Sequence, residues 1–159
     1  MIIRPASRSD YAEYVRLERQ IAQMHCDAMP GVFKPVADRS EKEFCKLLKD
    51  ADWALLVAAQ GATLLGIALS HVREQGESAT QKASRILELN SLCVDEACRE
   101  QGIGTQLIDA TKKLAKERGL TRLELNVWGF NEGARRLYER EGFGLMRTWM
   151  GIDVERYSP

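Results

Sequence analysis

The chain has 159 residues, a mass of 17.9 kDa, and 23 basic side chains against 23 acidic ones, so its formal net charge is zero. This length fits a single domain, 1–159, and 45% hydrophobic residues supply enough material for a core. The balanced charge gives no electrostatic reason to expect nucleic acid or an anionic membrane surface as a partner. The longest apolar run, 53–59, is too short to cross a membrane, and the first residues do not resemble a signal peptide.

The four cysteines and two histidines are scattered along the chain, and no two cysteines form a C-x-x-C pair. Zinc sites and disulfide frameworks need closely spaced ligands or a dense set of cysteines, so we expect neither. The composition instead indicates a reduced, cytoplasmic protein.

In the first half of the chain, helix-start signals, turn residues and short apolar runs predict a strand, two helices and a β-hairpin. Ser9-Asp10 opens a helix, Pro30-Gly31 marks a loop, and Gln60-Gly61 joins two apolar runs. The expected bounds are strand 1–4, helix 9–24, loop 24–35, helix 40–50, and hairpin strands 53–59 and 62–72.

The second half of the chain alternates strands and helices. Ile103, Leu107 and Leu114 recur at helical spacing, and Gly119 follows them as a stop signal. The expected bounds are exposed loop 73–82, strand 85–94, helix 102–118, strand 121–127, helix 131–141 and strand 143–153. The order β-α-α-β-β-β-α-β-α-β predicts an α/β fold with a mixed sheet, because hairpins give antiparallel neighbours and later β-α-β units favour a parallel pair.

A glycine-containing turn joins the strand that ends at Val94 to the next helix. Gly102 and Gly104 let the backbone turn tightly and approach a ligand closely. The amides of 101–105 would point together at a helix N-terminus, which favours a phosphate or pyrophosphate. The pattern is neither a Walker loop nor a Rossmann fingerprint. By themselves, the two glycines are equally consistent with a sharp turn that binds nothing.

Two polar residues of the following helix share one face. Asn131 and Tyr138 are seven residues apart in the sequence, which is about two helical turns. The phenol of Tyr138 is a candidate proton donor to a leaving group. Taken alone, Asn131 is also explained as a helix N-cap, and Tyr138 as a core aromatic residue.

Together, the two segments resemble the GNAT superfamily of acyl-CoA-dependent N-acetyltransferases. The first segment, Arg99-x-x-Gly102-x-Gly104, is similar to the pyrophosphate motif of that family. The second, which begins at Asn131 and ends with Gly142-Phe143, is similar to the family's strand–helix–strand motif. The opening strand and helix also look like the family's, so the resemblance covers nearly the whole chain.

The resemblance implies a strongly twisted mixed sheet flanked by helices, in which two parallel strands, 85–94 and 121–127, splay apart. Acetyl-CoA would be the cosubstrate and would lie between these strands. One strand would pair with its pantetheine arm, and the glycine turn would hold its pyrophosphate; no metal is expected. The residues implied in binding are Leu92, Cys93, Val94, Arg99, Gln101, Gly102, Ile103, Gly104, Thr105, Asn131 and Tyr138.

The implied reaction is direct attack of a primary amine on the thioester in a ternary complex, without an acyl-enzyme. Tyr138 matches the family's position for the acid that protonates the leaving thiolate. Glu88 is the candidate base, because strand alternation places it on the same face as Leu92 and Val94. Deprotonation relayed by solvent is the alternative. Cys93 raises a covalent route, but no histidine is placed to activate it.

The resemblance leaves the acceptor open between small-molecule amines and protein or peptide amines. The loop after the first helix would border the acceptor site, and His25, Phe33 and Trp128 are candidates to shape it. Dimers are frequent in the superfamily, so we expect a homodimer and no nucleic-acid or membrane partner. The alternatives to an enzyme are a non-catalytic module of the same fold that senses acyl-CoA, and a scaffold for another phosphorylated ligand.

Overall fold

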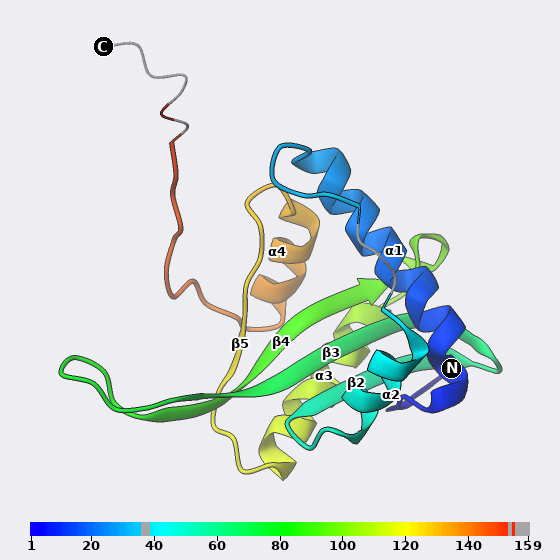
Figure 1. Cartoon of the computed structure of the whole chain (residues 1–159), viewed down its shortest axis with the longest axis horizontal. Helices are drawn as coiled ribbons and strands as arrows, with labels where there is room; N and C mark the ends of the chain where they lie inside the picture. Colours follow the sequence, from blue (N-terminus) through cyan, green and yellow to red (C-terminus); the bar gives the residue numbers. More distant parts are fainter. Residues whose placement is uncertain (36–38, 153, 155–159) are drawn as a thin grey trace.

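The structure, a computed structural model, describes residues 1–35, 39–152 and 154. It is the mixed α/β fold that the sequence predicts, with one five-stranded sheet between helices (Figure 1). The elements, in chain order, are β1 Ile2–Pro5, α1 Tyr11–Ala28, α2 Glu41–Lys49, β2 Trp53–Gln60, β3 Thr63–Gln75, β4 Ser84–Val94, α3 Ile103–Glu117, β5 Leu123–Leu125 and α4 Glu132–Arg140.

The strands lie side by side in sequence order, β1 to β5. The first four are antiparallel neighbours, and β4 and β5 are parallel. The parallel pair is joined only over 87–89 and 123–125, although β4 continues to Val94. The two strands therefore separate, as the resemblance implies, and the last five residues of β4 have no strand partner on the β5 side within the described chain.

A β-bulge at Asn90 interrupts β4, because its two chain neighbours face consecutive residues of β3. An extra residue moves the following side chains to the opposite face. Leu92 and Val94 accordingly pack with α3. Glu88 is paired with His71, on the face that α1 and α2 cover. The prediction that Glu88 shares a face with Leu92 and Val94 is wrong, because simple alternation does not hold across a bulge.

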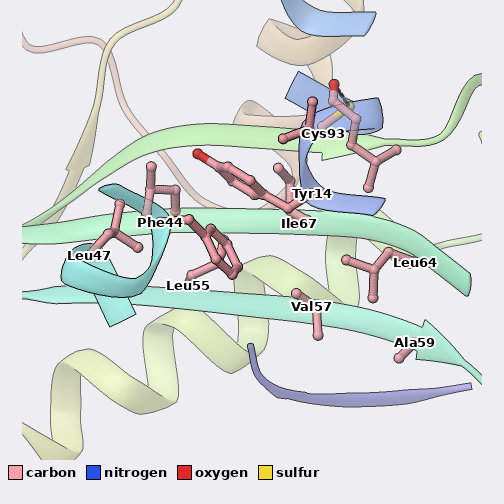
Figure 2. Close-up of a cluster of buried hydrophobic side chains, with 12 residues drawn as sticks. Tyr14, Phe44, Leu47, Leu55, Val57, Ala59, Leu64, Ile67 and Cys93 are labelled. Carbon is pink, nitrogen blue, oxygen red and sulfur yellow. Dashed lines mark hydrogen bonds between the residues drawn. The ribbon is translucent and has the colours of Figure 1, made fainter. Parts of the chain in front are cut away.

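Apolar side chains fill both faces of the sheet. On one face, α1 and α2 place Tyr14, Leu17 and Phe44 against the strands, where all three are fully buried (Figure 2). On the other face, α3 packs Ile103 and Leu107 against β2, β3 and β4. Burial of each such side chain contributes roughly 1.5–3 kcal/mol to the free energy of unfolding. These two layers fix the N-terminus of α3 against the separated end of β4.

The first strand and helix are tied by a buried carboxylate. Asp10 accepts two hydrogen bonds of 2.8 Å from the Arg4 guanidinium and one of 2.7 Å from the amide of Ser7. These contacts lower the pKa of Asp10 from 3.8 to about 2, with the Arg4 hydrogen bonds as the largest cause. The pair thus holds β1 against the beginning of α1.

The observed bounds differ from the prediction at several ends. The first helix continues to Ala28 before the loop begins, β1 includes Pro5, and β3 extends to Gln75, which shortens the exposed loop. The strand predicted over 121–127 is only three residues long. The predicted strand 143–153 is wrong for 143–152, which has no strand partner in the described chain; Asp153 lies outside the described residues.

None of the helices in the described ranges combines the length and apolarity that a bilayer crossing requires. No three His, Cys, Asp or Glu side chains of that part of the chain are grouped so that they could hold a metal ion. All four cysteines are free thiols.

Candidate functional site

The separated end of β4 leads into a turn with unusual backbone geometry. Glu100 and Gly102 both have positive φ, at 63° and 74°. A side chain in this left-handed region is strained by roughly 1–2 kcal/mol. A Cβ atom built on Gly102 would meet no atom within 4 Å, so the space in front of this residue is open. The conformation of Gly102 therefore favours a glycine, and the position of its missing Cβ faces no protein atom within 4 Å.

The turn leaves a row of backbone donors at the start of α3. The helix N-cap is Gly102, which has no side chain to satisfy them. The first helical hydrogen bond runs from the amide of Gln106 to the carbonyl of Gly102, at 3.1 Å. The amides of 101–105 lie before this bond and have no helical acceptor. Free amides at the positive end of a 15-residue helix attract an anion. The structure thus brings together the backbone donors that the sequence indicated.

The second glycine of the motif has a different role. A Cβ atom on Gly104 would lie 3.0 Å from Leu137 Cδ2 and 3.7 Å from Val94 Cγ2. The absence of a side chain at Gly104 therefore allows α3 to approach α4 and the end of β4. Lys112 and Glu141 join the same two helices by an ion pair of 3.0 Å.

The polar residues of α4 have well-defined partners. The Asn131 Oδ1 accepts a hydrogen bond of 3.1 Å from the amide of Ala134, so this side chain caps the helix. At the other end, Gly142 has φ of 88°, and the amide of Phe143 donates to the Tyr138 carbonyl at 3.0 Å. This helix end is a Schellman motif. The N-cap explanation of Asn131 is confirmed, and its cofactor role stays a prediction.

Tyr138 lies on the α3 side of the sheet, packed beside the cluster that contains Leu89 and Ile103. The ring of Phe143 meets it edge to face at 5.7 Å between centroids. Burial raises the pKa of Tyr138 to about 12, so the phenol keeps its proton at neutral pH. A proton donor must hold its proton until the leaving group needs it, and Tyr138 satisfies this condition.

The side chains of Arg99 and Thr105 differ in whether they are free to contact a ligand. Arg99 is half exposed, and among the described residues its one ion pair is a long contact of 3.5 Å to Glu96. Thr105 is already engaged, because its hydroxyl, after Lys112, helps to lower the pKa of the Glu141 carboxyl. Of the two, Arg99 is the one free to reach an anion at the turn.

Glu88 sits in a cross-strand network where β4 and β5 begin to separate. One carboxylate oxygen is 2.9 Å from Arg73 Nε, and the other accepts a hydrogen bond of 3.1 Å from Asn126 Nδ2. Arg73 also pairs with Glu124 at 2.7 Å. Both oxygens of Glu88 therefore have partners that hold the carboxylate in place, and each oxygen keeps a lone pair that can accept a proton, directly or through water.

Cys93 lies on the other side of the sheet from α3. It is buried in the cluster beneath α1, where its Sγ donates to the Leu17 carbonyl at 3.6 Å (Figure 2). Burial raises the pKa of the Cys93 thiol to about 12, so it is not a thiolate at neutral pH. The side chain is a core residue, which removes the covalent route from further consideration.

An aromatic cluster connects the end of α1 to the segment after β5. The ring centroids of His25 and Phe33 are 4.8 Å apart, and those of Phe33 and Trp128 are 5.0 Å apart. The structure thus brings together the three residues proposed for the acceptor side. It adds Phe130, 5.6 Å from His25, which the sequence analysis missed because nothing in its spacing marks it.

Comparison with known proteins agrees with this geometry. The acetyltransferase (GNAT) family model matches residues 19–143. YwnH of Bacillus subtilis (strain 168) is 31% identical over 86 residues, covering 52% of this chain and 50% of YwnH, so the chain spans about half the length of that relative. The BH1408 tetramutant from Bacillus halodurans has a TM-score of 0.88 at 26% identity, covering 96% of this chain and 99% of its own.

A more distant solved structure shares the fold alone. The aminoglycoside N-acetyltransferase AAC(6')-Iy in complex with CoA has a TM-score of 0.72 at 16% identity, covering 96% of this chain and 98% of its own. A twisted sheet with separated parallel strands and a glycine turn before α3 define an acyl-CoA N-acyltransferase fold. The chain belongs to the GNAT acetyltransferase family, since the family match covers most of its length.

Proposed function

We propose that the protein is an N-acetyltransferase that moves an acetyl group from acetyl-CoA to a primary amine in a ternary complex. The observation that carries this proposal is the open row of amides over 101–105, preceded by Gly102 at φ of 74°. This site fits a diphosphate, because unpaired amides at a helix N-terminus are the donors that such a group binds. Acetyl-CoA would supply an acyl group activated as a thioester.

The residues of the chain would divide the work of binding between backbone and side chains. The amides of 101–105 and the side chain of Arg99 would hold the diphosphate. Leu92, Cys93 and Val94 pair with β3 on one side, and their backbone groups on the other side would pair with the pantetheine arm, because that edge of β4 has no strand beside it in the described chain. Holding both reactants in line reduces the entropic part of the barrier by several kcal/mol.

Proton transfer would involve two groups on opposite faces of the sheet. Tyr138 would protonate the leaving thiolate, since burial keeps its phenol neutral. Glu88 would accept a proton from the amine, directly or through water, while Arg73 and Asn126 hold its carboxylate in place. The presence of both a candidate acid and a candidate base supports an enzyme over a module that only senses acyl-CoA.

We propose a small-molecule amine as the acceptor. The AAC(6')-Iy neighbour is by name an acetyltransferase of aminoglycosides, which are small-molecule amines. In this chain, the rings of His25, Phe33, Trp128 and Phe130 would form one wall of the acceptor site. Apolar rings favour an acceptor with an apolar or planar portion beside its amine.

The experiment that tests the function is thiol release from acetyl-CoA in the presence of a panel of amines. The panel should include aminoglycosides, arylalkylamines, polyamines and a short peptide. We expect thiol release that depends on one of the small-molecule amines, with mass spectrometry showing the acetylated product. CoA binding without turnover for any amine would instead support the sensing module.

A further inference from the structure

The segment between β4 and α3, 95–102, is held at its first residues by α1. The helix passes the end of β4 (Figure 1), and its Arg16 side chain pairs with Asp95, the residue that follows this strand. One turn later in the helix, the side-chain oxygen of Gln20 accepts a hydrogen bond of 3.2 Å from the amide of Glu96. Two side chains of α1 therefore contact the two residues with which this segment begins.

The Arg16 side chain joins three parts of the molecule. Besides Asp95, its guanidinium donates a hydrogen bond of 2.8 Å to the carbonyl of Leu64, at the beginning of β3. It also donates two hydrogen bonds to the carboxylate of Glu13 in its own helix, at 3.1 and 2.9 Å. Glu13 in turn accepts a hydrogen bond of 3.1 Å from the Leu64 amide. The guanidinium is thus fixed to a helix and a strand at the point where it contacts Asp95.

Asp95 extends this constraint to the backbone that follows it. Its Oδ1 accepts a hydrogen bond of 3.1 Å from the Ala97 amide, and its carbonyl accepts one of 2.8 Å from the Cys98 amide. Burial raises the pKa of this carboxyl, but the hydrogen bonds that it accepts, with that from Arg16 first, outweigh burial and lower the pKa of Asp95. The ionised carboxylate therefore links the guanidinium to the backbone of the next three residues.

The remainder of the segment is strained. Glu100 has φ of 63°, a backbone conformation that a residue with a side chain rarely adopts. Strained residues persist where the surrounding structure holds the chain on both sides of them. Here Ile103 packs into the core and fixes the end of the segment, while the contact between Arg16 and Asp95 fixes its beginning. The orientation of the turn therefore depends on both attachments.

We infer that Arg16 is a positioning residue for CoA binding: through Asp95, it holds the turn before α3 in the shape that presents the amides of 101–105 to the diphosphate. The inference rests on the proposed diphosphate site, and it needs no contact between Arg16 and CoA. Because Arg16 and Asp95 act through one contact, loss of either side chain should have the same effect on CoA affinity, although their charges are opposite.

The test compares the Kd for CoA of the full chain with those of Arg16→Gln, Asp95→Asn and the double variant, by calorimetry. Asp95→Asn keeps a side-chain oxygen for the Ala97 amide while it removes the charged acceptor of Arg16. We expect each single variant to weaken CoA binding by about tenfold, the size of one charge-assisted hydrogen bond, and the double variant to weaken it no further. Arg8→Gln is the matched control, because it removes the same charge from an exposed ion pair with Glu41, and its Kd should be unchanged.

A second measurement needs no ligand. In the ligand-free chain, Arg16→Gln and Asp95→Asn should shift the ¹⁵N NMR signals of 101–105, while Arg8→Gln leaves them in place. Protection of α3 from hydrogen exchange establishes that each variant is folded. If the unmodified chain bound no CoA and these shifts still occurred, the diphosphate site would be wrong, whereas the positioning of the turn by Arg16 would stand.

Three results would overturn the inference. Weaker CoA binding in Arg16→Gln with tighter binding in Asp95→Asn would show that Arg16 acts by its charge on an anionic ligand. Unchanged CoA affinity in both single variants would show that the contact only stabilises the fold. Losses that add in the double variant would show that the two residues act independently. If Arg16→Gln did not fold, the direction of the change in Asp95→Asn would still decide between positioning and charge.

Discussion

Gly104 of α3 and Leu137 of α4 approach so closely that a Cβ atom on residue 104 would lie 3.0 Å from Leu137 Cδ2. The contact holds α4, and with it Tyr138, beside the N-terminus of α3. A methyl group at residue 104 must push Leu137 away by a few tenths of an ångström. The distance between the turn at 101–105, which we propose binds the diphosphate, and the phenol of Tyr138 therefore depends on a glycine at this position.

We predict an energetic coupling between these two residues. Gly104→Ala should stabilise the fold by about 1 kcal/mol through helix propensity and destabilise it by crowding Leu137. The single variant therefore reports only the sum of two opposite effects. In the Leu137→Ala background the crowding is absent, and Gly104→Ala should be more favourable by at least about 0.5 kcal/mol. Urea unfolding of the four proteins measures this difference.

The matched control for this cycle is Gly133→Ala, also in a helix but with nothing within 4 Å of the added Cβ. Its effect on the free energy of unfolding should be the same with Leu137 or Ala at position 137. Equal effects of Gly104→Ala in both backgrounds would contradict the contact.

A second prediction concerns the phenol of Tyr138, which follows Leu137 in α4. Tyr138→Phe should lower kcat by roughly tenfold to a hundredfold, while the Kd for CoA stays unchanged, because only proton donation is lost. Since the pKa of Tyr138 is raised to about 12, its ionisation should cause no fall in activity at pH 9 to 10. Steady-state kinetics and calorimetry with CoA measure both quantities.

Tyr11→Phe is the control, because the Tyr11 hydroxyl bonds to the Arg39 carbonyl at 2.8 Å, on the α1–α2 side of the molecule. Its kcat should match that of the unmodified chain. If Tyr138→Phe also left kcat unchanged, Tyr138 would not be the acid.

The third prediction addresses the proton acceptor. Glu88→Gln should flatten the rise of activity with pH, since the amide cannot accept a proton through water. Glu124→Gln is the control, because Glu124 shares the Arg73 ion pair without being proposed as the base. Both variants disturb the network, and only Glu88→Gln should change the shape of the pH–rate profile. Identical pH–rate profiles for Glu88→Gln and Glu124→Gln would indicate that solvent, and not Glu88, deprotonates the amine.

Much of this fold could be predicted from local sequence signals. Ser40 begins a helix because its hydroxyl accepts a hydrogen bond from the Glu43 amide, a capping box that is legible in the sequence. Gln60-Gly61 predicts the hairpin, since Gly61 adopts the positive φ that this turn needs. The glycine motif likewise predicts the turn before α3. In each case a few neighbouring residues determine the backbone.

The errors arise where the outcome depends on distant partners. The bulge at Asn90 leaves Glu88 on the α1 side of the sheet, opposite to Leu92 and Val94. The residue types near Asn90 do not predict an extra residue in the strand pairing. The apolar pattern of 143–153 predicts a strand that 143–152 does not form, because a strand needs a neighbour to bond to and this part of the described chain has none. The aromatic cluster includes Phe130 because the loop after α1 folds toward the segment after β5, which spacing alone cannot reveal.

The fourth prediction is a dependence of stability on acid pH. Arg4 and Ser7 lower the pKa of Asp10 from 3.8 to about 2, so the ionised carboxylate stabilises the folded state. This contribution is complete above the unfolded value near 3.8 and is lost as the pH falls toward 2. Asp10→Asn should lower the free energy of unfolding at neutral pH by about 2 kcal/mol and flatten its decline in that acid range.

Urea unfolding at a series of pH values measures this dependence. Asp27→Asn provides the comparison, since in the described part of the chain Asp27 bonds only to Gln23, at 2.7 Å, on the exposed side of α1. It should keep the full acid dependence. An unchanged decline in Asp10→Asn would assign the acid sensitivity to other carboxylates.

The central claim is that the amides of 101–105 bind the diphosphate of CoA, and a ¹⁵N NMR titration with CoA tests it most directly. We predict that these amides shift strongly and saturate together, and that Gly102→Val, which strains the turn, weakens binding by at least about tenfold. If CoA shifted other amides and left 101–105 unchanged, or if Gly102→Val bound CoA as tightly as the unmodified chain, the account would be contradicted.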